Sequence, residues 1–208
     1  PSTHADPGEH ALNHSKLIFL ATALLAIATR ASAEGVARQT AEIVAQGSMG
    51  PVVSADGATL IRTSNGVSVS FSMPTPVSGS YIYPDPNPFQ SIVIPGHPEV
   101  FSGWIFIFNN PAGCSDPCNG DDLGDTPARG GAYNLAGHVV GSGSTLMLAG
   151  HVSAGSEAFA GVPLDNPAGA EVHVAAAPHG MLLPGQMPTQ INYPIGTPAL
   201  WWAAIFLP

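Results

Sequence analysis

The chain has 208 residues and a formal net charge of −9, and only 9% of its residues are charged, against about 25% in ordinary globular domains. Residues 34–208 contain no lysine, and their only fixed positive charges are Arg38, Arg62 and Arg129. A nucleic-acid partner requires a basic patch that displaces counterions from phosphates, and these residues cannot build one. Anionic membranes would also repel such an acidic surface. The composition leaves neutral polymers, small molecules and cations as partners.

The first predicted element is a targeting segment. Lys16 precedes an apolar run over residues 17–28, which is shorter than the roughly 20 residues that span a bilayer. Ala31-Ser32-Ala33 then forms a small-x-small cleavage signature. The pattern predicts a signal peptide cleaved after Ala33, secretion to the extracellular space or periplasm, and no stable membrane span after cleavage. A buried core helix is the alternative.

The elements expected after the cleavage site are mostly short strands. Residues 34–45 are expected to form a short helix or a disordered lead-in. Asn65-Gly66 is a turn signal, and the alternation of Val67, Val69, Phe71 and Met73 with serines predicts a half-buried strand. Residues 104–108 are apolar on both faces, as in a central strand. Further strands are expected at 80–83, 92–94, 136–140, 145–148, 170–174 and 200–207.

No stretch beyond residue 45 shows a helical period, so the sequence predicts an all-β fold, a β-sandwich or jelly-roll of about seven to eight strands. The expected division is 1–33 for the upstream segment and signal peptide, 34–65 for a lead-in and first strand region, and 66–208 for the β-sandwich domain.

Cys114 and Cys118 are the only cysteines. In an oxidising compartment two cysteines this close are expected to form a disulfide that pins one loop. The alternative, a thiolate metal site, needs more than two soft ligands.

Histidines carry the main functional prediction. Glu171 and His173 are two residues apart, so both side chains project from one face of a strand. If His138 and His179 converge on that face, the three imidazoles and the carboxylate form a site for Cu or Zn, and three protein ligands with an open position are typical of a catalytic centre. Glu171 is then a fourth ligand or a catalytic group that orients an imidazole. His151 is a further candidate ligand, His97 is expected in a loop, and the alternative is that the histidines are unrelated strand residues.

A second group of candidates lies around the cysteines. Carboxylates and an amide gather there and would offer oxygen ligands to Ca²⁺, but their spacing does not fit the helix-loop-helix calcium pattern, so a solvated acidic loop is the favoured interpretation. The residues concerned are Asp116, Asn119, Asp121, Asp122 and Asp125.

A serine nucleophile has no local signature in this chain. Gly150-His151-Val152-Ser153-Ala154-Gly155 has one residue too many before the serine for Gly-x-Ser-x-Gly. A metal-free serine hydrolase therefore stays open on geometric grounds alone.

Residues 104–191 carry a set of short motifs, namely Phe108-Asn109-Asn110-Pro111, Cys114 with Cys118, Asp122-Leu123, Gly137-His138-Val139-Val140-Gly141, Glu171-Val172-His173, His179-Gly180 and Gln190-Ile191. This set resembles an uncharacterised family of secreted bacterial proteins. The similarity extends more loosely to chordin-type domains and to copper-zinc superoxide dismutase sandwiches. It implies a β-sandwich and points to His138, Glu171, His173 and His179, while Glu171-Val172-His173 lacks the first histidine of a dismutase His-x-His pair.

Together these features predict a secreted metal-binding β-sandwich, a copper oxidoreductase or zinc hydrolase acting on an extracellular polymer or small molecule. A non-catalytic binding or matrix module is the alternative. In that case exposed aromatic residues would stack on sugars or partner surfaces, namely Tyr81, Tyr83, Trp201 and Trp202.

Overall fold

Alternation of small polar and apolar residues gives this chain its main building element, a strand with one buried and one exposed face. In β3 (Gly66–Pro74), Val67, Phe71 and Met73 are almost completely buried, whereas Ser70 on the opposite face is exposed. Successive side chains of a strand point to opposite sides of the sheet, so this pattern directs every second residue into the core. The expected half-buried strand is confirmed.

The computed structural model describes residues 36–46, 50–83, 88–89, 94–115, 118–141, 143–194 and 198–208. Its strands are β1 (Ala37–Val44), β2 (Val52–Thr63), β3, β4 (Glu99–Phe108), β5 (Gly130–Val140), β6 (Thr145–Ser153), β7 (Ala160–Gly161), β8 (Glu171–Met181) and β9 (Trp202–Phe206). The helical elements are α1 (Met187–Asn192) and the short turns η1 (Pro111–Gly113), η2 (Gly120–Asp122) and η3 (Pro198–Leu200).

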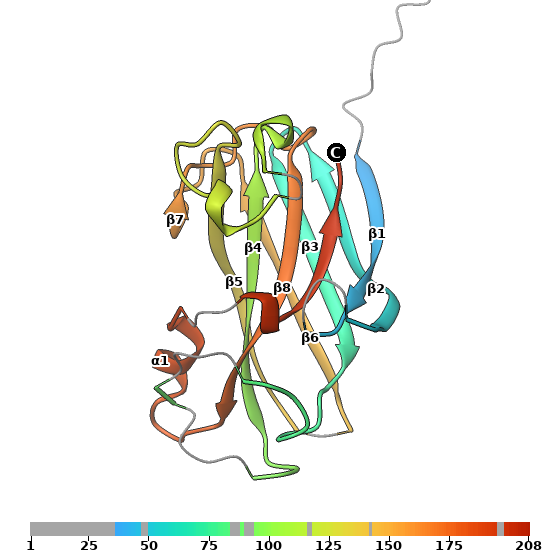
Figure 1. Cartoon of the computed structure of the whole chain (residues 1–208), viewed down its shortest axis with the longest axis vertical. Helices are drawn as coiled ribbons and strands as arrows, with labels where there is room; N and C mark the ends of the chain where they lie inside the picture. Colours follow the sequence, from blue (N-terminus) through green and yellow to red (C-terminus); the bar gives the residue numbers. More distant parts are fainter. Residues whose placement is uncertain are drawn as a thin grey trace, which may run out of the picture. The chain divides into compact units, whose positions relative to one another are not determined.

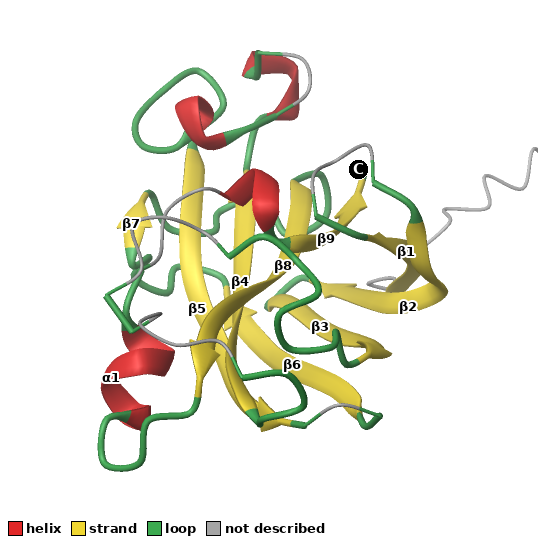
Figure 2. Cartoon of the chain, turned by 60° about the horizontal axis from the view of Figure 1, so that its bottom comes forward, coloured by secondary structure: helices red, strands yellow, loops and turns green. Residues whose placement is uncertain are grey.

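The nine strands form one curled antiparallel sheet in the order β6-β3-β2-β1-β9-β8-β4-β5-β7 (Figures 1 and 2). The all-β prediction is therefore confirmed. Backbone hydrogen bonds connect all the described strands into a single sheet. β9 joins the two halves of the sheet. It pairs with β8 over five residues but with β1 only through Val44 and Ala203.

The inner face of the curled sheet holds the main core, which gathers Leu60, Phe71, Phe101, Ile105 and Val172, among others. A second cluster covers the outer face of β4 and β8, where Trp104, Ala175 and Ala177 pack with Trp201. The strand at 104–108 was expected to be central, and β4 is buried along almost its whole length. It is covered on both faces because these two clusters lie on opposite sides of it.

A β-bulge in β5 decides which way its second half faces. Trp104 pairs with Asn134, but the preceding residue, Gly103, pairs with Ala136, so Leu135 has no partner across the ladder. An extra residue in one strand reverses the facing of every residue beyond it. As a result His138 pairs with Phe101, which is fully buried on the inner face.

Several expected elements differ from the structure. Part of the range 34–45 forms β1 rather than a helix or lead-in, because β1 pairs along β2. Residues 80–83 form no strand, since their side chains bond to the loop around them. The strand expected at 170–174 is β8, which starts at Glu171 and runs seven residues further, to Met181.

The expected targeting segment and cleavage site lie outside the described residues, as does part of the strand expected at 92–94. In the described part of the chain no helix reaches the length and apolarity needed to cross a bilayer.

Candidate functional site

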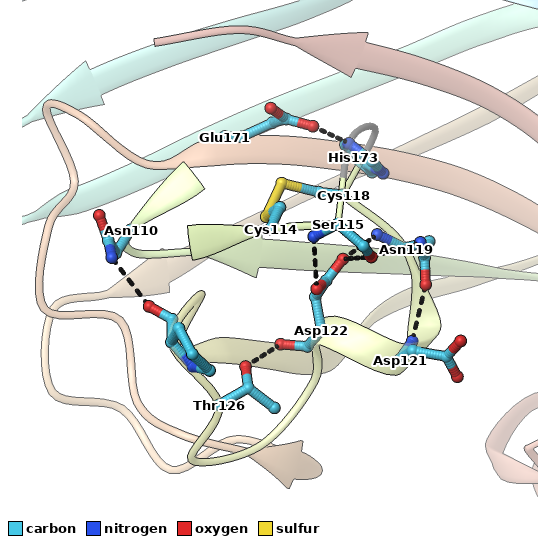
Figure 3. Close-up of a disulfide and its surroundings, with 11 residues drawn as sticks. Asn110, Cys114, Ser115, Cys118, Asn119, Asp121, Asp122, Thr126, Glu171 and His173 are labelled. Carbon is cyan, nitrogen blue, oxygen red and sulfur yellow. Dashed lines mark hydrogen bonds and ion pairs between the residues drawn. A yellow bond between two sulfur atoms is a disulfide. The ribbon is translucent and has the colours of Figure 1, made fainter. Parts of the chain in front are cut away.

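Glu171 and His173 lie on one face of β8, as their spacing predicts. Val172 and Val174 between and after them are fully buried in the inner core, so the pair faces outward, beside the disulfide loop (Figure 3). His173 Nε2 donates to Glu171 Oε1 at 2.6 Å, and both side chains are largely buried. Burial lowers the pKa of His173, although the neighbouring Glu171 opposes that shift. A neutral imidazole that donates from Nε2 carries its lone pair on Nδ1.

His179 lies further along the same strand in a closed environment. It is 0% exposed, and its Nε2 lies 2.7 Å from Ser102 Oγ, which also accepts the indole N–H of Trp104. Burial lowers the pKa of His179 to about 4. A serine next to an imidazole resembles a nucleophile with its base. Both residues are completely buried here, however, and His179 Nδ1 has no hydrogen-bond partner among the described residues.

The three histidines expected to share one metal ion are not brought together. His173 and His179 are six residues apart on one strand, which at ~3.3 Å per residue separates them by about 20 Å. His138 faces the other side of the sheet because of the bulge in β5, and its Nδ1 accepts the backbone N–H of Met147 at 3.1 Å. Metal–nitrogen bonds are about 2 Å long, so the three imidazoles do not meet around one ion in this geometry, and their role as metal ligands stays a prediction. Among the described residues, no group of three His, Cys, Asp or Glu side chains is placed to hold a metal.

The remaining histidine candidates occupy separate places. His151 is exposed on the outer face of β6, where its Nδ1 lies 2.8 Å from Ser68 Oγ. His97 lies in the loop before β4, as expected. Neither side chain contacts the pair formed by Glu171 and His173 in the interactions described.

The acidic loop is organised by one of its own carboxylates. Asp122 accepts the backbone N–H groups of Ser115 and Asn119 and the Ser115 hydroxyl, which together lower its pKa, with the Ser115 backbone bond the largest cause (Figure 3). Its oxygens are therefore used in hydrogen bonds that hold the loop together. Asp121 and Asp125 are exposed, and Asp125 lies 3.9 Å from Arg129.

Asp116, the fourth carboxylate of the expected calcium group, lies outside the described residues. The predicted disulfide between Cys114 and Cys118 is confirmed.

A cavity of about 480 Å³ opens beside the ends of β1 and β3. Two aromatic residues, Tyr81 and Trp202, form part of its wall, and their rings meet edge to face at 4.9 Å. None of the lining residues carries a charge. The others are Ala45, Gln46, Val53, Pro74, Thr75, Pro76 and Ser80.

Behind Tyr81 lies a buried carboxylate. Glu99 is 2% exposed, and it accepts hydrogen bonds from the hydroxyls of Ser78, Tyr81 and Tyr83. Burial raises the pKa of Tyr81, and the charge of Glu99 raises it further, so the phenol keeps its proton and remains a donor. Tyr81 therefore lines the cavity and, through its hydroxyl, bonds a buried carboxylate.

The aromatic residues expected to be exposed are used differently. Trp201 and Trp202 are each only 4% exposed, because both are packed into apolar clusters. Tyr81 and Tyr83 are partly exposed and stack at 4.4 Å. The sequence pointed to Tyr81 and Trp202 as exposed stacking residues, whereas in the structure both line the cavity. Sequence reasoning missed Glu99 entirely, although a carboxylate opening an apolar strand was a signal.

In comparisons with known proteins, no family model, no curated protein and no solved structure matches this chain.

Proposed function

We propose that this chain is an exported, non-catalytic binding module that captures a small organic molecule, or one unit of an extracellular polymer, in the cavity beside Tyr81 and Trp202. The observation that carries the proposal is the cavity itself, which joins aromatic walls to neutral polar groups. Small-molecule sites are typically concave and mostly apolar, with a few polar groups that orient the ligand.

Hydrogen bonds to distant parts of the chain hold two lining residues of this cavity, Gln46 and Thr75, in place. Gln46 lies between two segments, donating to Leu200 O at 2.8 Å and accepting the backbone N–H of Ile82 at 2.9 Å. Thr75 bonds Ser144 at 3.0 Å. A site whose walls are fixed before binding loses little conformational entropy when the ligand arrives. Export is supported by the disulfide, which persists in oxidising compartments.

The test is an NMR titration of amide and indole N–H signals with cellobiose, N-acetylglucosamine and choline. The Trp202 indole signal is assigned by its loss in Trp202→Phe. We expect saturable shifts of this signal with at least one of the probes, at a dissociation constant below about 1 mM.

Two matched variants locate the binding. Ser80→Trp places a large ring at an exposed position that lines the cavity, and it should abolish the shifts. Ser70→Trp makes the same change at an exposed serine of β3 that does not line the cavity, so it should bind normally. No saturable shift with any probe, or equal binding by both variants, would show that the cavity is not a ligand site.

Transition-metal binding is a second candidate function, supported by one observation. A metal-bound histidine commonly donates its other ring N–H to a carboxylate, and Glu171 provides that arrangement for His173 at 2.6 Å. The test is elemental analysis of protein purified without a nickel column and reconstituted with Cu²⁺ or Zn²⁺. We expect bound metal that is lost in His173→Gln. If the wild-type protein binds less than about a tenth of an equivalent, or if the variant binds as much as wild type, this candidate fails.

A further inference from the structure

We propose that the ligand of the cavity beside Tyr81 and Trp202 is an organic cation, a substituted ammonium group, held by cation–π contact with the ring of Tyr81 near the buried charge of Glu99. This inference rests on the proposed function and names the chemical class of its ligand.

Among the residues that the structure describes, no cationic side chain pairs with the charge of Glu99. Residues 34–208 have only three fixed positive charges. Arg62 is bonded to backbone carbonyls near Ala170, and Arg129 pairs with Asp125 and Asp165. Arg38 is exposed on β1. The partners that stabilise Glu99 are instead three neutral hydroxyls. Three donors around two oxygens suit an anion but leave its charge uncompensated.

Tyr81 transmits this charge to the cavity. Its hydroxyl donates to Glu99 Oε2 while the residue lines the cavity wall. A phenol that donates to a carboxylate gains electron density, which strengthens the negative potential of its ring face, and a ring face of this kind attracts ammonium groups within about 6 Å of its centre. Tyr83 adds a second hydroxyl on Glu99 and a second ring 4.4 Å from that of Tyr81.

The cavity does nothing to oppose a cation. Its lining residues are neutral, so an entering ammonium group meets no like charge. The net charge of −9 also attracts cations towards the domain. A neutral sugar would gain nothing from Glu99, because the three hydroxyls already occupy the carboxylate and it is only 2% exposed.

The experiment compares choline with its neutral carbon isostere, in which a tert-butyl group replaces the trimethylammonium group. Both probes have the same shape, so the ratio of their dissociation constants reports the charge alone. Titrations follow the Trp202 indole signal, as above. We expect choline to bind about threefold to thirtyfold more tightly than the isostere.

Two variants test the route of the effect. Tyr81→Phe keeps the ring but removes the bond to Glu99, and it should weaken choline binding several-fold while leaving the isostere unchanged. Glu99→Gln should do the same, and its thermal unfolding shows whether the variant is folded. If the isostere binds as tightly as choline, or both variants leave the ratio unchanged, the cation assignment is wrong, although the cavity remains a ligand site. If neither probe nor any sugar shifts the signal, the proposed function itself fails.

Discussion

Acidification should destabilise this domain through His179, and the size of the effect follows from its burial. The side chain is 0% exposed, and its pKa falls from an ordinary 6.5 to about 4 in the folded state. The unfolded chain therefore binds a proton between these values while the folded protein does not. The stability that neutral His179 contributes is complete above the unfolded pKa and is lost as the pH falls towards 4. From about pH 7 to about pH 5 the linkage relation gives a loss of about 2 kcal/mol from this residue.

Urea unfolding at these two pH values measures the loss in wild type and in His179→Gln. Glutamine can still bond Ser102 but does not titrate, so the free energy of unfolding of the variant should fall by about 2 kcal/mol less than that of wild type. The comparison uses the change in the free energy of unfolding between the two pH values within each protein, so a difference in absolute stability between the proteins does not affect it. His151→Gln, at an exposed position of β6, is the control, and it should keep the His179 contribution. A pH difference in His179→Gln within about 0.5 kcal/mol of wild type would refute the reasoning.

Three further outcomes are expected from the packing. Arg62→Met should lower the free energy of unfolding by about 3 kcal/mol in urea titrations, because it removes the donors to the partly buried carbonyl of Pro167 and the buried carbonyl of Ala170. An unchanged urea midpoint would contradict the role given to these bonds. Reduction of the Cys114–Cys118 disulfide, which spans four residues, should cost about 2 kcal/mol and lower Tm by about 4–8 °C. A larger fall in Tm would mean that the disulfide loop also stabilises other parts of the domain. Gly150→Ala should destabilise the domain by about 1–3 kcal/mol in the same assay, because its Cβ would lie 2.4 Å from Leu135 Cδ1. A neutral result would show that β5 and β6 can separate there.

Local sequence patterns predicted those strands whose residues alternate between apolar and polar or are apolar throughout. They failed for strands that form only because a neighbouring strand pairs with them. β3 was readable because serines separate its apolar residues, and β4 because it is apolar throughout. β1 was not, since only Ile43 within it is fully buried and its residues favour no structure by themselves. It becomes a strand because β2 is there to pair with it.

The candidate site shows the same division. The shared face of Glu171 and His173 follows from the two-residue period of a strand, and it is confirmed. The facing of His138 depends on the unpaired Leu135, and a bulge of this kind leaves no mark in the sequence. The cavity was equally hidden, because β9 and the loop after β3 bring Trp202 and Tyr81 together from distant parts of the chain.

The position of β9 has a consequence for how the molecule is made. Its neighbours in the sheet, β1 and β8, begin 165 and 31 residues before it in the chain, at Ala37 and Glu171 against Trp202. The two halves of the sheet can therefore be joined only after residues 202–206 have left the ribosome. Pairings this distant in sequence form slowly. Until they form, β1 and β8 present open edges that are prone to misassociate, so a chain interrupted before Trp202 should accumulate as aggregate rather than as a smaller folded domain.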